Sequence, residues 1–206
     1  EEDAIGPSFY DMHMAFLGNV DGNWDVFFYD FRSAITSRIT TTTEDESAVH
    51  AYGNYLTYVR GADTDARVYA FDLETATETQ ITTVQSGSPR IWRSVLVYDR
   101  YDGSDWDVHA YDLAADMDSA LVDTTANEFG PDMRNGRISY ITDTTGMAVT
   151  HVIDIGASTD TAQTDSPAGQ HAAAIHYGED PPATLRARRL EIPADGSSTG
   201  VFSALS

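Results

Sequence analysis

An eight-residue stretch recurs in this chain almost unchanged. Residues 24–31 read WDVFFYDF, and residues 106–113, eighty-two positions later, read WDVHAYDL. Weaker copies lie between and after these two, so the underlying period is close to forty residues. Five such copies account for the 206 residues of the chain. A period of this length is typical of architectures in which each copy folds as one unit and packs against its neighbours.

Two columns of residues define the copies. The first is an acidic residue near the end of the stretch, with successive spacings of 42, 40, 42 and 37 residues. The second is usually a proline after a small residue, and an aromatic residue follows it after nine or ten positions. The acidic column is Asp30, Asp72, Asp112, Asp154 and Glu191; the proline column is Pro7, Val49, Pro89, Pro131 and Pro167; the aromatic column is Phe16, Tyr58, Tyr98, Tyr140 and Tyr177.

Local signals inside a copy predict four short strands. In the fourth copy, FGPDM and RISYIT are joined by Asn135-Gly136, the favoured pair for a two-residue type I′ hairpin turn, and VTHVIDI and DTAQT follow. Gly53-Asn54 occupies the corresponding place in another copy. The third strands are apolar on both faces, so both faces of each sheet must be covered. Sheets stacked around an axis provide that environment, which indicates a β-propeller.

We therefore predict an all-β fold: a five-bladed β-propeller with four antiparallel strands per blade. The expected blades cover about 6–43, 48–84, 88–123, 129–164 and 167–206, all within a single domain of residues 1–206. The strand order is the same in the first and last copies, so the ring should close without a strand swapped between its ends. The alternative is that the chain is a piece of a longer propeller.

The third copy resembles the WD-like repeat of the TolB-type β-propellers. The pattern runs from a proline through a Φ-x-Y strand to W-D-V-x-x-Y-D-L. It is carried by Pro89, Tyr98, Trp106, Asp107, Tyr111, Asp112 and Leu113. The resemblance extends loosely over all five copies, with a shorter turn in place of the S-P-D-G of that family. It implies the propeller fold.

The charge balance narrows the classes of partner. The 33 acidic residues outnumber 12 basic residues, all of them arginine, and the formal net charge is −21. Binding to duplex phosphates needs a basic stripe, so nucleic acid is not an expected partner. No run approaches the roughly 18 apolar residues of a membrane span, so membrane insertion is not expected either. An acidic chain without lysine is typical of salt-loving organisms, and we expect an extracellular, cell-surface or periplasm-like location in a halophilic organism.

Residues next to the proline column are candidates for a ligand site, because the innermost strands of a propeller surround its axis. The residues one and three positions after the column vary in polarity, whereas those between them, such as Phe9 and Met133, are apolar. Packing between blades is the competing interpretation. The candidate axial residues are Tyr10, His50, Tyr52, Arg90, Trp92, Asp132 and Arg134.

Two acid-rich turns between the second and third strands are candidates for calcium. Alternating oxygen side chains around a glycine are how calcium loops collect their ligands, although Asp-Gly is also common hairpin chemistry. The candidate ligands are Asn19, Asp21, Asn23 and Asp25 in the first turn, and Asp99, Asp102, Asp105 and Asp107 in the second. No other cofactor is expected.

Catalytic constellations are scarce. No Ser-His-Asp spacing, H-x-x-H pair or glycine-rich phosphate loop occurs. Glycoside hydrolysis needs two carboxylates about 5 to 9.5 Å apart. Only Asp132 is expected on an inner strand, because Glu46 and Glu128 are assigned to loops. His109 and His151 occupy a column that is aromatic in earlier copies, so we expect them to pack inside their blades.

These observations favour a chain that works by binding. We expect a recognition or scaffold propeller for a protein, peptide or glycan at the axial face. The alternatives are a glycoside hydrolase that acts on polysaccharide and a structural module of a larger surface assembly.

The net charge leads to a prediction about salt. In dilute buffer the carboxylates repel one another, whereas at about 1 M salt the Debye length falls to about 3 Å. The melting temperature should therefore rise steeply between dilute buffer and molar potassium chloride, measured by thermal unfolding with equally concentrated sucrose as the uncharged control. A melting temperature that does not respond to salt would contradict the halophile interpretation.

Overall fold

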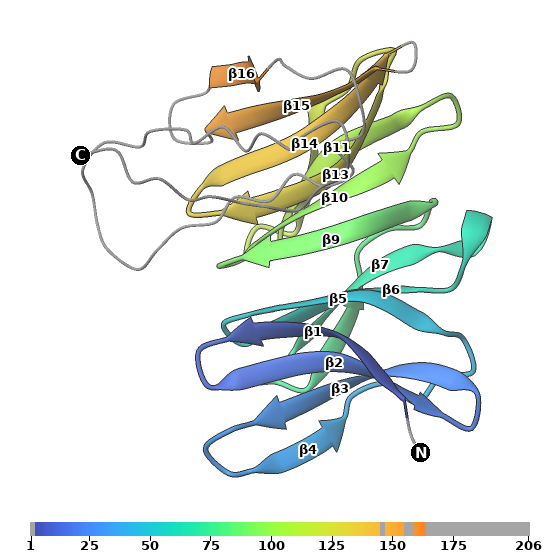
Figure 1. Ribbon diagram of the computed structural model, residues 1–206, viewed down its shortest axis with the longest axis vertical. Helices are drawn as coiled ribbons and strands as arrows, with labels where there is room; N and C mark the ends of the chain where they lie inside the picture. The colour runs from blue at the N-terminus through green and yellow to red at the C-terminus, as the bar shows by residue number, and fades with distance from the viewer. Residues whose placement is uncertain (1–2, 145–146, 155–158, 164–206) are drawn as a thin grey trace, which may run out of the picture. The chain divides into compact units, whose positions relative to one another are not determined.

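The computed structural model describes residues 3–144, 147–154 and 159–163 (Figure 1). All of them belong to a single structural unit. Sixteen β-strands account for nearly all the regular structure of this part of the chain. Its one helical element is the three-residue 3-10 turn η1 (Asp63–Asp65), and no helix in the described ranges is long and apolar enough to cross a bilayer.

The strands form four antiparallel sheets, each built from four consecutive strands. They are β1 (Ala4–Tyr10), β2 (His13–Val20), β3 (Asn23–Asp30), β4 (Ile35–Arg38); β5 (Glu46–Tyr52), β6 (Tyr55–Arg60), β7 (Arg67–Asp72), β8 (Thr77–Gln80); β9 (Ser86–Trp92), β10 (Val95–Tyr101), β11 (Trp106–Asp112), β12 (Met117–Val122); β13 (Asn127–Arg134), β14 (Arg137–Thr144), β15 (Met147–Asp154), β16 (Thr159–Gln163). The predicted four-strand repeat is confirmed for these sheets. The fifth expected blade, residues 167–206, and the closure of the ring lie outside the described residues.

The first strands of neighbouring sheets lie next to one another. β1 contacts β5, β5 contacts β9, and β9 contacts β13, as Figure 1 shows. Each hydrophobic cluster draws on two sheets: one joins Val26 of the first sheet to Leu56 of the second, the next joins Val68 to Leu96, and a third joins Val97 to Ile138 of the fourth. At the three interfaces between the described sheets, the apolar faces inferred from the sequence are therefore covered by neighbouring sheets.

Phe9 occupies the same column as three buried residues of the other sheets. Ala51, Ile91 and Met133 are at most 5% exposed, whereas Phe9 is 63% exposed. Since Ala51 packs against the sheet before it, the face of the first sheet that carries Phe9 is where a closing fifth blade is expected. That closure remains a prediction.

A bulge in every first strand explains the proline column. The pairing of each first strand with its neighbour shifts register at this point. The residue before the column takes a left-handed conformation, with φ of +62° at Gly6, +53° at Ala48, +48° at Ser88 and +61° at Gly130. Small residues adopt positive φ most easily, and proline, which has no N–H to donate, is tolerated where the ladder is broken.

The predicted hairpin turn at Asn135-Gly136 is confirmed. Both residues have positive φ, +52° and +76°, and they join Arg134 to Arg137. At the corresponding place in the second sheet only Gly53 has positive φ, at +58°, so its turn is not of type I′ despite the similar composition.

Three members of the aromatic column, Tyr58, Tyr98 and Tyr140, lie at the buried centre of their sheets. Tyr98 and Tyr140 are each 1% exposed and stack on the residues paired with them, His109 and His151, with ring centroids 5.8 and 4.8 Å apart. The first and second sheets place two aromatic residues in the same arrangement. Packing of His109 and His151 inside their sheets is therefore confirmed.

The bulge allows the cost of a left-handed backbone conformation to be measured separately from steric clashes of the side chain. A Cβ added at Gly130 would meet no atom within 4 Å, so only its φ of +61° opposes a side chain. We expect Gly130→Ala to lower the free energy of unfolding by about 1 kcal/mol in urea denaturation. Ala48→Gly is the matched reverse substitution and should be neutral or stabilising. Equal destabilisation by both variants would contradict the assignment of strain to this position.

Candidate functional site

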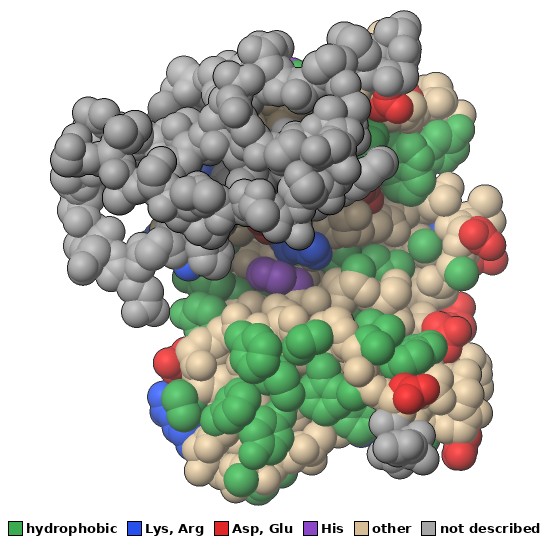
Figure 2. All heavy atoms as spheres, in the orientation of Figure 1, with side chains coloured by type: hydrophobic (Ala, Val, Ile, Leu, Met, Phe, Trp, Pro, Cys, Tyr) green, Lys and Arg blue, Asp and Glu red, His purple; other side chains and the backbone are tan. Residues whose placement is uncertain are grey.

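The candidate axial residues all lie on first strands. Tyr10 is on β1, His50 and Tyr52 on β5, Arg90 and Trp92 on β9, and Asp132 and Arg134 on β13. All are partly buried except Arg134, which is exposed. Figure 2 shows histidine and basic side chains together in the middle of this face, with acidic side chains toward the edge at which the first strands begin.

The residues one position after the proline column connect neighbouring sheets. Ser8 Oγ accepts a hydrogen bond from the Ala51 N–H at 3.0 Å, and His50 Nδ1 accepts one from the Ile91 N–H at 3.3 Å. In the next pair of sheets the same column forms an ion pair instead, with Arg90 Nε 3.7 Å from Asp132 Oδ1. These side chains therefore hold the sheets together, whatever else they bind.

His50 is neutral in this arrangement, because its Nδ1 is an acceptor. Burial lowers its pKa from 6.5 to about 4, and the positive charge of Arg90 adds to the effect. A neutral imidazole that is already hydrogen-bonded to the backbone is poorly suited to exchange protons near pH 7.

The residues three positions after the proline column form an aromatic row. The rings of Tyr10 and Tyr52 are 4.3 Å apart. Burial raises the pKa of the Tyr52 phenol. The Arg93 guanidinium lies 4.5 Å above the Trp92 ring. The row therefore extends over the first strands of three sheets and presents ring surfaces.

A cleft lies at the opposite end of the first strands, where they begin. It has a volume of about 880 Å³ and is lined by residues of all four described sheets. Its lining includes four carboxylates and two tryptophans, and no arginine, lysine or histidine among the described residues. The acidic and aromatic lining residues are Asp45, Glu46, Asp63, Asp99, Trp24 and Trp106. This cleft could not be predicted from the repeat pattern, since its residues come from different columns of the repeat.

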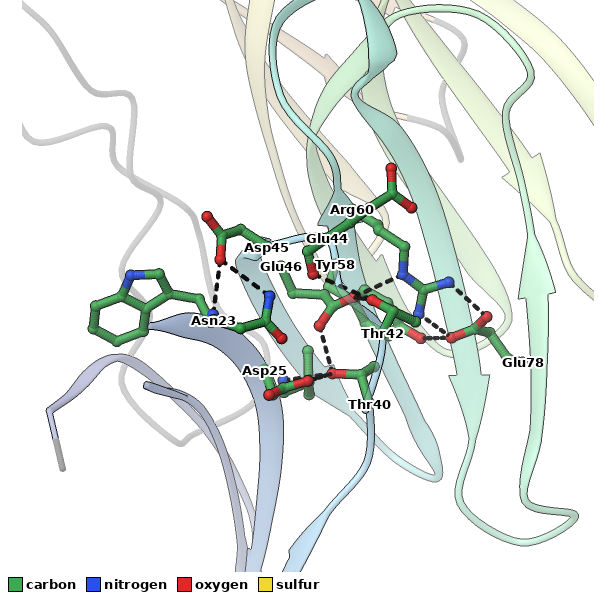
Figure 3. Close-up of polar contacts among 12 residues, drawn as sticks. Asn23, Asp25, Thr40, Thr42, Glu44, Asp45, Glu46, Tyr58, Arg60 and Glu78 are labelled. Atoms are coloured by element: carbon green, nitrogen blue, oxygen red, sulfur yellow. Dashed lines mark hydrogen bonds and ion pairs between the residues drawn. The ribbon is translucent and has the colours of Figure 1, made fainter. Parts of the chain in front are cut away.

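A buried polar network joins the first and second sheets beside this cleft (Figure 3). Glu46 is 2% exposed and accepts hydrogen bonds from Arg60 Nε at 2.7 Å and from Thr40 Oγ1 at 2.6 Å. Arg60 also pairs with Glu78 at 2.6 Å. The assignment of Glu46 and Glu128 to loops was wrong, because both lie buried on first strands.

The first acid-rich turn does not gather its side chains around one point. Asn19 Oδ1 accepts from the Gly22 N–H, and the Asn23 amide donates to Asp45. Asp25 is fully buried, and its carboxylate pairs with Arg38 at 2.5 Å. Asp21 is exposed. Asn23 and Asp25 already have protein partners, so the predicted set of four is not poised around a cation.

The second acid-rich turn does gather carboxylates. Asp102, Asp105 and Asp107 each offer an oxygen, and the three oxygens lie within 4.8 Å of one another. Asp99 is directed elsewhere, because its Oδ2 accepts the Gly130 N–H at 3.1 Å. Burial, together with neighbouring carboxylates, raises the pKa of Asp107 to about 6. Of the four predicted ligands of this turn, the structure thus brings three together and leaves out Asp99.

Comparison with known proteins identifies the fold. No family model and no curated protein matches the sequence. Among solved structures, a protein assigned as TolB from Agrobacterium tumefaciens matches with a TM-score of 0.59 and 10% identity over 73% of this chain and 60% of its own. TolB from Acinetobacter baumannii matches with a TM-score of 0.58 and 15% identity over 76% and 42%. A prolyl endopeptidase structure matches with a TM-score of 0.58 and 11% identity over 77% and 26%.

These identities are low, so the likeness concerns the fold. The described part of the chain has the fold of TolB-type β-propellers, as the repeat pattern predicted. The chain spans 60% or less of the length of each of these structures.

The contact of His50 leads to a prediction about pH. Its pKa is about 4 in the folded chain against 6.5 as its ordinary value, so the unfolded chain takes up the proton first as the pH falls. The resulting stabilisation is complete above pH 6.5 and is lost between pH 6.5 and 4, by up to about 3 kcal/mol. His50→Asn keeps an acceptor oxygen but does not titrate.

The difference between wild type and His50→Asn in urea unfolding, measured from pH 7.5 to 4, should therefore change over this window. Both proteins share all other titrating groups, which cancel in the difference. Parallel stability curves would show that His50 is not held neutral.

Proposed function

We propose that this chain is a non-catalytic recognition propeller that binds a positively charged protein or peptide segment in the acidic cleft at the beginning of its first strands. The observation that carries the proposal is the combination of carboxylates and tryptophans in that cleft, without a basic side chain among its described lining residues. Its volume of about 880 Å³ is within the range of pockets that bind small ligands or a few residues of a peptide.

Two of the four carboxylates are available to a ligand. Glu46 is already paired with Arg60, and Asp99 is 6% exposed and bonded to the Gly130 N–H. Asp45 and Asp63 are exposed. A cationic group between them would be favoured both by these charges and by the net charge of −21.

The two tryptophans are held by equivalent contacts. The Trp24 N–H donates to Asp45 Oδ1 at 2.8 Å, and the Trp106 N–H donates to Asn127 Oδ1 at 3.2 Å. Each bond joins the start of a third strand to the next sheet, so the backbone beneath each indole is fixed. Tryptophan binds cations over its ring face, and fixed aromatic residues are common anchors of binding energy.

The remaining features support binding over catalysis. The axial carboxylate Asp132 is paired with Arg90, and the axial imidazole of His50 is bonded to the backbone. The aromatic row of Tyr10, Tyr52 and Trp92 is a second surface, at which a glycan is the alternative ligand. A secreted or surface setting at high salt, and a place in a larger assembly, belong to the same proposal. The acidic composition supports the first.

Binding of capped peptides tests the proposal. A tetrapeptide with two arginines should bind, measured by calorimetry at one ionic strength, whereas its glutamine and glutamate counterparts should not. Asp45→Asn with Asp63→Asn removes two charges and keeps similar shapes, since Asn Oδ1 still accepts the Trp24 N–H and asparagine tolerates the φ of +49° at position 63. This double variant should weaken binding by at least about tenfold.

A matched control distinguishes the effect of the charges in the cleft from the effect of the net charge of the whole chain. Asp11→Asn with Asp21→Asn also removes two exposed charges at positions of positive φ, outside the cleft lining, and should bind almost as well as wild type. Trp106→Ala and Trp92→Ala separate the two ends of the first strands. Loss of binding in Trp92→Ala alone would place the ligand on the aromatic row, and polysaccharide turnover that is lost in Asp132→Asn would replace the proposal with a hydrolase.

A further inference from the structure

Two equivalent positions of the repeat hold a buried aspartate with different surroundings. Asp25 and Asp107 both directly follow a tryptophan near the start of a third strand, and they are 0% and 2% exposed. In the first sheet Arg38 neutralises Asp25, with its Nη2 2.5 Å from Oδ2, and the Thr40 hydroxyl lies 3.3 Å from Oδ1. A buried carboxylate needs such partners, because removal from water strongly disfavours its charge.

The third sheet lacks both partners. Phe27 of the first sheet pairs with Arg38, and its counterpart His109 pairs with Ala120, so Ala120 stands where the arginine would be. Val122 likewise stands in the place of Thr40, opposite Val108. Asp107 Oδ1 is fully buried and accepts no hydrogen bond from any described residue. Arg100 is paired with Asp107 across the neighbouring strands, but its guanidinium contacts Asp118 at 3.0 Å. Asp107 is therefore buried without a counterpart of the two groups that contact Asp25.

The neighbouring residues add negative charge to this place. Asp102 and Asp105 bring their oxygens within 4.8 Å of Asp107, and Asp102 is held in position by the N–H groups of Ser104 and Asp105 at 2.7 and 3.2 Å. In the second sheet Glu46 faces Arg60 across a strand pair, but the equivalent Glu128, also fully buried, faces Thr142. The interface between the third and fourth sheets thus has no counterpart of Arg38 or Arg60, which pair with Asp25 and Glu46 at the interface between the first and second sheets.

We infer that Asp102, Asp105 and Asp107 bind one divalent cation, which neutralises the third sheet as Arg38 neutralises the first. The donors are all carboxylate oxygens, which favour hard cations such as calcium and magnesium over zinc or copper. Three oxygens within 4.8 Å of one another are compatible with a single ion at the roughly 2.3 to 2.6 Å of calcium–oxygen bonds. Calcium accepts the irregular geometry of a loop and a strand, whereas magnesium requires a near-octahedral site, so calcium is the ion we assign.

Calcium titration of the chelator-treated protein tests the inference. At constant ionic strength, wild type should bind one calcium ion per chain in calorimetry, and its melting temperature should rise with calcium and less with magnesium. Asp107→Asn should abolish the calcium response, and its melting temperature without calcium should equal or exceed that of wild type, since a buried charge is removed. Asp21→Asn in the first acid-rich turn is the matched control and should respond as wild type does.

A second variant keeps the test informative if Asp107→Asn fails to fold. Ala120→Arg places a guanidinium where Arg38 lies in the first sheet, so it should raise the melting temperature without calcium and weaken calcium binding at least tenfold. A gain in stability together with the loss of calcium binding is not expected from simple damage to the sheet.

Terbium luminescence locates the ion. Trp106 lies between two of the proposed ligands in sequence, so terbium in this site should be sensitised by it, and Trp106→Phe should remove the signal that the equivalent Trp24→Phe retains. The inference is overturned if wild type gains no stability from calcium, if Asp107→Asn and Ala120→Arg bind calcium as wild type does, or if the signal depends on Trp24.

Discussion

The second and third sheets bury apolar side chains on both of their faces, because each packs between two neighbouring sheets. A single sheet of this kind is not stable by itself, so each described sheet depends on the sheets packed against it. The hydrophobic clusters follow this rule, because each joins residues of two neighbouring sheets. The repeat is therefore a requirement of packing, and the four-stranded unit recurs because its neighbours have the same shape.

The polar groups at these interfaces are less uniform than the apolar ones. One column supplies the hydroxyl of Ser8, the imidazole of His50 and the ion pair of Arg90 with Asp132, all of which connect neighbouring sheets. A buried carboxylate at another column is paired with Arg38 in the first sheet and has no such partner in the third. Apolar packing thus determines the period of the repeat. The interfaces differ in whether their buried carboxylates are paired with arginine, and an unpaired carboxylate is where a charged ligand or ion can bind.

The sequence predicted those features that depend on neighbours close along the chain. The strands, the Asn135-Gly136 turn and the stacking positions of His109 and His151 follow from alternation, turn chemistry and column spacing. The burial of Glu46 and Glu128 could not be read in this way. Glu46 is stabilised by Arg60 on the next strand, and no local pattern distinguishes it from a solvated glutamate.

The candidate axial residues were placed on the correct strands, but the cleft was missed because it draws its lining from several columns and all four described sheets. By itself the sequence determined a repeated four-stranded antiparallel unit, covered on both faces, in a strongly acidic chain. Only the tertiary structure decided which acids are buried, which are paired and which converge, as Asp102, Asp105 and Asp107 do. The physical reason is that hydrogen bonding and turn preference act between neighbours in sequence, whereas the energy of a charge depends on every group that surrounds it in space.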